Sequence, residues 1–225
     1  MNVFTEKTAV VFGGTGLIGQ HLISGLIQDA LFKEIVVVTR GELPIDHFKI
    51  IHKRINFSNA KEIKDCIPKG SIVFSAIGTT NARVKGDKSR YREIDHDITL
   101  NIARSCLDQE AARFLYVSSG GANAGSTNFY LKLKGEIDAA VTALNLNSTL
   151  IFRPSLLLGA REEFRFGERI AQVVMPLISF AFPKNLKPIR AKDVAKVMIQ
   201  LSKSKYSGTV VIENWQQRQL AALMD

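Results

Sequence analysis

A glycine-rich turn near the N-terminus constrains the fold more than any other feature of the sequence. The apolar run Ala9–Phe12 stops at Gly13-Gly14-Thr15-Gly16-Leu17-Ile18-Gly19, and a segment with helical spacing, Leu17–Ala30, follows at once. Glycines permit a tight strand-to-helix turn and let backbone amides approach a pyrophosphate at the helix N-terminus. The motif and its context predict a dinucleotide-binding βαβ unit. The residues expected to contact the cofactor there are Gly13, Thr15, Gly16, Leu17, Ile18 and Gly19.

Short runs of β-branched and aromatic residues alternate with helical patterns along most of the chain. This alternation is typical of βαβ units, and it predicts a doubly wound parallel Rossmann sheet of strand order 3-2-1-4-5-6. A later run, Thr209–Glu213, offers a seventh strand. The other predicted strands are Ala9–Phe12, Glu34–Thr39, His52–Phe57, Ser71–Ile77, Arg113–Val117 and Ser148–Phe152, and the predicted helices are Leu17–Ala30, Ala60–Ile67, Ser89–Gln109, Asn128–Leu144 and Ala191–Ser202.

The alternation breaks after Pro154, within a chain of 225 residues that otherwise fits a single α/β domain, residues 1–225. We expect residues 156–187 to form a small cap or substrate region over the carboxyl edge of the sheet. Its mostly apolar part, Ile170–Pro183, could line a substrate cavity, form a homodimer contact or touch a membrane. A cavity or a dimer contact is favoured, because Pro176 interrupts the segment and it is too short to span a bilayer.

The net charge and the cysteine content limit the classes of partner that we expect for this chain. The formal net charge of +9 favours anionic partners such as phosphorylated cofactors. The basic residues are scattered, so no specific nucleic-acid binding is expected, and no apolar run predicts a membrane span. Cys66 and Cys106 belong to no CxxC or Cys/His cluster, and the four histidines lack ligand spacing, so we expect no metal site. Reduced thiols and the absence of a secretory signal favour a cytoplasmic location.

The residues at two strand ends indicate which cofactor binds and where it lies. The second predicted strand ends at Thr39 and is followed by Arg40, where an acidic residue would bind the ribose 2′-hydroxyl of NAD. Arg40 instead offers a fork of donors that suits a 2′-phosphate, so NADP(H) is favoured and NAD(H) stays open. The fourth strand runs into residues suited to a backbone that passes beneath a cofactor, namely Ala76, Ile77, Gly78 and Thr79.

A tyrosine, a lysine and two serines suggest the chemistry. Tyr130 and Lys134 lie four residues apart, hence on one face of a helix, and the fifth strand ends in Ser118-Ser119. A cation beside a phenol favours the phenolate, and the pair can exchange a proton with a carbonyl or alcohol while hydride moves to or from nicotinamide. A serine hydroxyl would polarise the same oxygen. Ser119, Tyr130 and Lys134 are the predicted catalytic residues, with Ser118 as the alternative to Ser119.

Together with Arg153-Pro154, these motifs resemble the short-chain dehydrogenase/reductase superfamily, and within it the short, atypical TIP30/CC3 oxidoreductase-like family. The closer resemblance rests on the serine pair, on Phe129-Tyr130-Leu131-x-x-Lys134-Gly135-Glu136 and on Phe152-Arg153-Pro154-x-Leu156-Leu157-Leu158. It implies an NADP(H)-binding Rossmann fold in which Lys134 also contacts the nicotinamide ribose and Arg153 and Pro154 lie near the cofactor. The sizeable C-terminal substrate domain of extended members is missing, which argues against sugar-nucleotide chemistry.

Two functions follow from the resemblance. The first is an NADP(H)-dependent reductase of a small carbonyl compound; the second is a non-catalytic NADP(H)-binding redox sensor that acts through a protein partner. The Ser119, Tyr130 and Lys134 set favours the enzyme, since a sensor needs no proton donor. Asn101, on the preceding helix, is a candidate fourth member of the set, whereas Asp95 is interpreted as a local hydrogen-bonding residue rather than a proton carrier.

Overall fold

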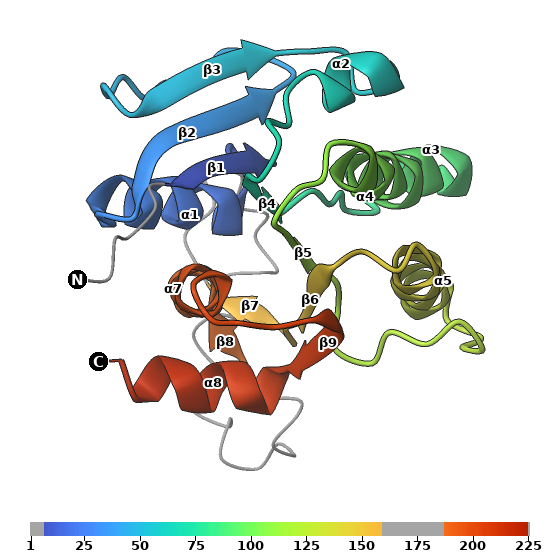
Figure 1. The fold of residues 1–225 in the computed structure, drawn as a ribbon. Helices are drawn as coiled ribbons and strands as arrows, with labels where there is room; N and C mark the ends of the chain where they lie inside the picture. Colours follow the sequence, from blue (N-terminus) through green and yellow to red (C-terminus); the bar gives the residue numbers. More distant parts are fainter. Residues whose placement is uncertain (1–6, 159–186, 225) are drawn as a thin grey trace.

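The computed structural model describes residues 7–158 and 187–224. Its centre is a seven-stranded parallel sheet of order β3-β2-β1-β4-β5-β6-β9 (Figure 1). The predicted strand order is therefore confirmed, and the seventh strand pairs in parallel with β6. The strands are β1 Lys7–Phe12, β2 Phe32–Thr39, β3 Ile50–Arg54, β4 Ile72–Ser75, β5 Arg113–Val117, β6 Ser148–Arg153 and β9 Gly208–Glu213.

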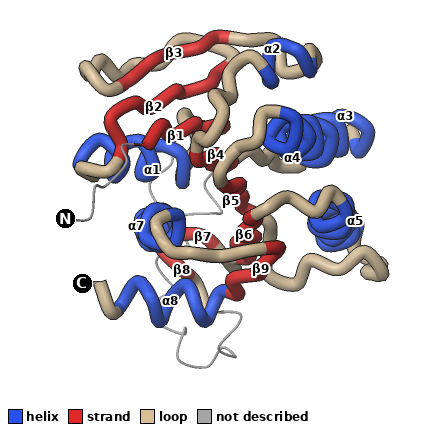
Figure 2. Tube along the Cα trace, viewed as in Figure 1, coloured by secondary structure: helices blue, strands red, loops and turns tan. Residues whose placement is uncertain are grey.

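Helices cover both faces of the sheet (Figure 2). On one face lie α1, α7 and α8, and on the other lie α2, α4 and α5, with the short α3 preceding α4 in the chain. The helices are α1 Leu17–Gln28, α2 Ala60–Lys64, α3 Lys88–Arg92, α4 Ile98–Asp108, α5 Phe129–Ala143, α7 Ala191–Ser202 and α8 Asn214–Ala222. Each face buries its own apolar cluster, so the sheet is covered on both sides, as parallel sheets require.

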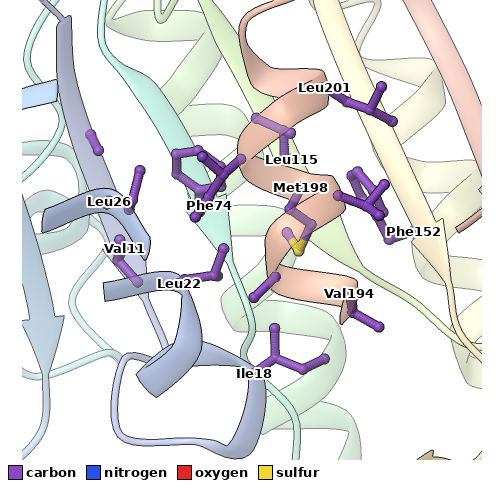
Figure 3. Packing of buried hydrophobic residues seen from close by; sticks show 14 of the residues in the cluster. Val11, Ile18, Leu22, Leu26, Phe74, Leu115, Phe152, Val194, Met198 and Leu201 are labelled. Atoms are coloured by element: carbon purple, nitrogen blue, oxygen red, sulfur yellow. The ribbon is translucent and has the colours of Figure 1, made fainter. Parts of the chain in front are cut away.

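Figure 3 shows the cluster between the sheet and the α1–α7 pair. Leu22 and Leu26 of α1 and Met198 of α7 pack over Phe74 and Phe152, and all five side chains are fully buried. Their spacing of four residues on α1 places the two leucines on one side of the helix. This packing fixes the N-terminus of α1 against the carboxyl end of β1.

The pairing register places several strand ends side by side. Phe12, the last residue of β1, pairs with Val38 of β2 and with Ser75 of β4. On the other half of the sheet, Val117 of β5 pairs with Phe152 of β6. The loops that follow these parallel strands therefore leave from the same edge, which is where doubly wound sheets bind ligands.

One predicted helix proved to be three segments. The run expected as a single helix, Ser89–Gln109, consists of α3, a π-helical turn η1 (Glu93–Asp97) and α4. Hydrophobic periodicity does not distinguish a π turn from the α-helix around it. Such turns widen the helix locally and occur frequently at functional sites.

Most strands differ from their predicted bounds by one or two residues, and β3 and β4 differ most. The third strand occupies Ile50–Arg54 rather than His52–Phe57, because it is a largely exposed edge strand with a weak apolar pattern. The fourth, predicted as Ser71–Ile77, ends at Ser75, and the chain beyond it turns beneath the glycine-rich loop.

The start of the predicted cap and the residues just after its end form a second, two-stranded parallel sheet. In it β7 (Leu157–Leu158) pairs with β8 (Ile189–Arg190). Residues 159–186, which include the apolar segment Ile170–Pro183, lie outside the described residues. None of the helices in the described part of the chain has the length and apolar character needed to cross a membrane.

Candidate active site

A cleft of about 660 Å³ lies at the carboxyl edge of the sheet. It is bordered by the loops after β1, β4, β5 and β6 and by one side of α5. Most of the predicted site residues line it: Thr15, Gly16, Leu17, Ile18, Ala76, Ile77, Gly78, Thr79, Ser119, Tyr130, Lys134 and Pro154. The cleft is also lined by residues that the sequence analysis did not propose for the site, among them Gln20, Pro44, Thr80, Arg83, Asp95, Val117, Ser155 and Leu157.

The glycine turn shapes one wall of this cleft. Gly13 has a φ of +82°, and a Cβ on it would lie 2.7 Å from the carbonyl carbon of Ala76, so the turn packs directly on the segment after β4. A Cβ on Gly19 would lie 2.1 Å from the carbonyl oxygen of Gly13. These two glycines therefore serve the backbone packing of the turn, and neither lines the cleft itself.

The N-terminus of α1 fits an anion. Its N-cap is Gly16, which makes no side-chain cap, and its first turn carries no acidic residue. Gly16, Leu17 and Ile18 border the cleft. The first amides of a helix have no intrahelical acceptor, and with the helix dipole they attract a phosphate. The residues present thus suit the pyrophosphate of a dinucleotide.

Arg40 lies outside the residues that line the cleft, exposed just after β2. The neighbouring Thr39 holds the turn: its Oγ1 donates to the Gly41 carbonyl at 2.5 Å and lies 2.7 Å from Nε2 of His52. Because the hydroxyl has a single proton, Nε2 of His52 is the donor in the second contact. Arg40 therefore lies within a turn that the Thr39 side chain closes, and His52 in turn holds the Thr39 hydroxyl.

The two serines after β5 differ in their contacts. Both line the cleft. The Oγ atom of Ser118, which is 4% exposed, has no hydrogen-bond partner among the described residues. The Oγ atom of Ser119 donates to the Gly120 carbonyl at 3.3 Å. A buried hydroxyl without a partner is costly, so Ser118 is as suited as Ser119 to bind a substrate oxygen.

Tyr130 and Lys134 lie on α5, which begins after the N-cap Asn128. The Lys134 Nζ atom lies 5.9 Å from the centroid of the Tyr130 ring. The tyrosine ring is held edge-to-face against Tyr91 of α3, at 6.2 Å between centroids. The phenol and the ammonium therefore stand together on the cleft wall, as their spacing predicted.

Lys134 has a partner that the sequence analysis did not assign to it. Its Nζ lies 2.8 Å from Oδ2 of Asp95, and both residues are buried. Burial acts to lower the pKa of Lys134, but the negative charge of Asp95, with smaller contributions from Tyr130 and Asp138, outweighs it and raises the pKa. Asp95 also accepts the backbone N–H of Thr79, so the expected local hydrogen bond is present as well. Asn101 does not line the cleft.

Arg153 does not reach the cleft, in contrast to Pro154. Its guanidinium pairs with Asp138 of α5 and with Glu213 at the end of β9. The guanidinium therefore joins α5 to β9, and the expected place of Arg153 near the cofactor stays a prediction.

Comparisons with known proteins agree with this geometry. The family model for the NAD dependent epimerase/dehydratase family matches residues 9–204. The chain is 35% identical over 167 residues to the Candida glabrata protein FMP52, mitochondrial, covering 72% of this chain and 69% of that protein. It is 30% identical over 204 residues to the Candida albicans protein of the same name, covering 88% and 89%.

Solved structures share the fold at low sequence identity. MoeE5 in complex with UDP-glucuronic acid and NAD aligns with a TM-score of 0.70 and 16% identity, covering 97% of this chain and 82% of MoeE5. The Thermus thermophilus UDP-glucose 4-epimerase in complex with NAD aligns with a TM-score of 0.69 and 14% identity, covering 96% and 82%. At such identities the likeness shows the Rossmann fold alone.

The relatives correct one expectation and leave another untested. The expected cytoplasmic location is wrong, because the matched FMP52 proteins are named as mitochondrial. The finer resemblance to TIP30/CC3 oxidoreductases stays a prediction. The match over residues 9–204, the strand order and the glycine turn agree at the coarser level: the chain belongs to the NAD dependent epimerase/dehydratase family.

Proposed function

We propose that this protein is an NADP(H)-dependent oxidoreductase that interconverts a small carbonyl compound and its alcohol. The observation that carries the proposal is a single cleft bordered both by the uncapped N-terminus of α1 and by Tyr130 and Lys134. An anion-binding helix end alone is sufficient for a binding protein. A phenol beside a buried ammonium adds a proton donor, which only a reaction requires.

Each group that borders the cleft has its own role in the proposed reaction. The amides at the start of α1 bind the pyrophosphate, and Lys134 donates to ribose hydroxyls. When bound, the nicotinamide dinucleotide supplies or accepts the hydride. Tyr130 donates its phenolic proton to the carbonyl oxygen in the reductive direction and takes it back in the oxidative one. The hydroxyl of Ser118 or Ser119 donates a hydrogen bond to the same oxygen.

The preference for NADP(H) rests on Arg40. The residue follows β2 directly, in the position where an acidic side chain would favour NAD. The nearby Glu42 is paired with Arg54, Nη1 to Oε1 at 2.6 Å, which partly neutralises its charge. A guanidinium at this place suits a 2′-phosphate.

The test has two stages. Fluorescence titration with NADPH and NADH measures binding, and failure of both to bind would overturn the proposal. Consumption of NADPH is then followed over a panel of aldehydes, ketones and quinones. Tyr130→Phe should lower turnover by roughly 10²- to 10⁴-fold with cofactor affinity unchanged. No turnover with any substrate, together with an effect of Tyr130→Phe on a protein partner alone, would favour the redox sensor instead.

A further inference from the structure

Asp95 and Lys134 form an ion pair that is almost completely removed from water. Asp95 is 1% exposed and Lys134 4%, and the two charged atoms lie 2.8 Å apart. Burial of a charge costs several kcal/mol unless a partner compensates it, and two apolar residues would often be more stable at such a place. A buried pair on a cleft wall is therefore better explained by what it does there than by stability.

The carboxylate of Asp95 also contacts the segment that follows β4. Its Oδ1 accepts the backbone N–H of Thr79 at 2.7 Å, while its Oδ2 faces Lys134. All three residues line the cleft. One side chain thus connects the segment after β4 with α5 and leaves neither of its oxygens without a contact.

Asp95 lies in the π-helical turn η1 and faces inward. Asp97, two residues further along the same turn, has a side chain that is 54% exposed and lies 2.7 Å from Nδ1 of His96. The two acids therefore have different environments although the sequence sets them in one short acidic stretch. Asp97 is a matched control for the charge of η1.

We propose that Asp95 is a positioning residue that holds the Lys134 ammonium charged and fixed on the cleft wall. This proposal depends on the proposed function only for the identity of the ligand that Lys134 binds. The consequence is that the cation keeps its proton, and its place beside Tyr130, over the whole working pH range. An asparagine at position 95 would keep the bond to Thr79 but would leave the ammonium unpaired.

Other charged or titratable groups around Lys134 do not replace Asp95. Tyr130 and Asp138 act on it from its own helix, and Asp138 is already shared with Tyr116 of β5 and Arg153 of β6. On η1 itself, the side chains of His96 and Asp97 face each other. Removal of the Asp95 charge therefore leaves burial, which lowers the pKa of Lys134, as the main remaining influence.

The decisive experiment titrates Lys134 in the ligand-free protein. Lysines carry ¹³C at Cε, and the Lys134 signal is assigned by its absence in Lys134→Arg. The titration midpoint of wild-type Lys134 should lie above that of the surface lysines. In Asp95→Asn it should move to lower pH by about one pH unit or more. Asp97→Asn should leave it in place, and Asp95→Glu should restore most of the wild-type value. An unchanged midpoint in Asp95→Asn, or an equal shift in Asp97→Asn, would overturn the proposal.

Cofactor affinity gives an independent readout. Wild-type affinity for NADPH should be flat between neutral pH and pH 10, whereas in Asp95→Asn it should fall by about fivefold as Lys134 loses its proton. Flat affinity in the variant, with its titration shifted, would refute a role in cofactor binding. If wild type binds no dinucleotide, the proposed function fails while the titration in the ligand-free protein still decides the role of Asp95.

Discussion

The guanidinium of Arg153 meets one carboxylate oxygen of Asp138 twice, with Nε at 2.9 Å and Nη2 at 2.8 Å from Oδ2. The other oxygen accepts the phenolic hydroxyl of Tyr116 at 2.7 Å. A third contact, at 3.4 Å, joins Arg153 to Glu213. This network ties α5, which carries Tyr130 and Lys134, to three neighbouring strands beneath the cleft.

Arg153→Gln should destabilise the fold and leave the affinity for NADPH unchanged. The change leaves the buried Asp138 without its main partner, so the unfolding free energy in urea should fall by about 3 kcal/mol. Arg92→Gln breaks a more exposed pair with Glu136 and should cost less than about 1 kcal/mol. Equal losses in the two variants would contradict the framework role. A selective loss of NADPH affinity in Arg153→Gln would restore it as a cofactor residue.

Arg40→Ala should discriminate between the two dinucleotides. Loss of a charge-assisted contact to a 2′-phosphate should weaken NADPH binding by roughly 10- to 100-fold and leave NADH binding within about twofold, as measured by fluorescence titration. Arg54→Ala on the adjacent β3 is the matched control, because its guanidinium is occupied by Glu42. Parallel losses for NADPH and NADH in Arg40→Ala would refute the 2′-phosphate assignment.

His52→Leu should also weaken the preference for NADPH, because His52 supports the turn that carries Arg40. Removal of the ring withdraws the donor that meets Thr39 and loosens the turn from which Arg40 extends. The affinity for NADPH should fall by about fivefold, the equivalent of one hydrogen bond, with little change for NADH. Thr39→Val should reproduce the effect. An NADPH affinity that neither variant changes would show that the turn does not position Arg40.

Alkaline pH should destabilise the protein, because its buried thiols and phenols resist ionisation in the folded state. Burial raises the pKa of Cys106, Cys66, Tyr91 and Tyr116. A folded-state pKa above the unfolded value gives stability that is complete below the unfolded value and is lost as pH rises. The loss should therefore begin near pH 9, the ordinary thiol value. Each group contributes at most about 1.4 kcal/mol per pH unit.

Cys106→Ala provides the check on that prediction. The variant should melt at a lower temperature than wild type at neutral pH, because it leaves a small cavity. Its melting temperature should nevertheless decline less steeply between pH 8 and about pH 11. A decline as steep as that of wild type would exclude the Cys106 thiol as a contributor.

The sheet could be predicted from the sequence where local signals agree. Arg113–Val117 and Ala191–Ser202 match their predicted bounds, because a buried strand and a strongly amphipathic helix each have a clear apolar pattern. The edge strand β3 does not, since most of its side chains are exposed. The glycine turn was predictable because strand, turn and helix follow one another within the 22 residues from Lys7 to Gln28.

The site was predictable only in part, and for a physical reason. Tyr130 and Lys134 share a helix face, which spacing reveals. The role of Arg153 depends on partners 15 and 60 residues away, at Asp138 and Glu213. Asp95 faces inward from a segment with a local change in helical winding, for which residue types give no signal.

That winding makes the length of the segment from α3 to α4 a constraint in its own right. The π turn Glu93–Asp97 already accommodates one residue more than an α turn, so insertion of a further residue there would rotate one flank against the other by the roughly 100° that each residue adds to an α-helix. Tyr91 and Ile102, both buried, could then no longer face the core together. A substitution along this segment changes one contact, whereas such an insertion would turn a whole helix away from the core.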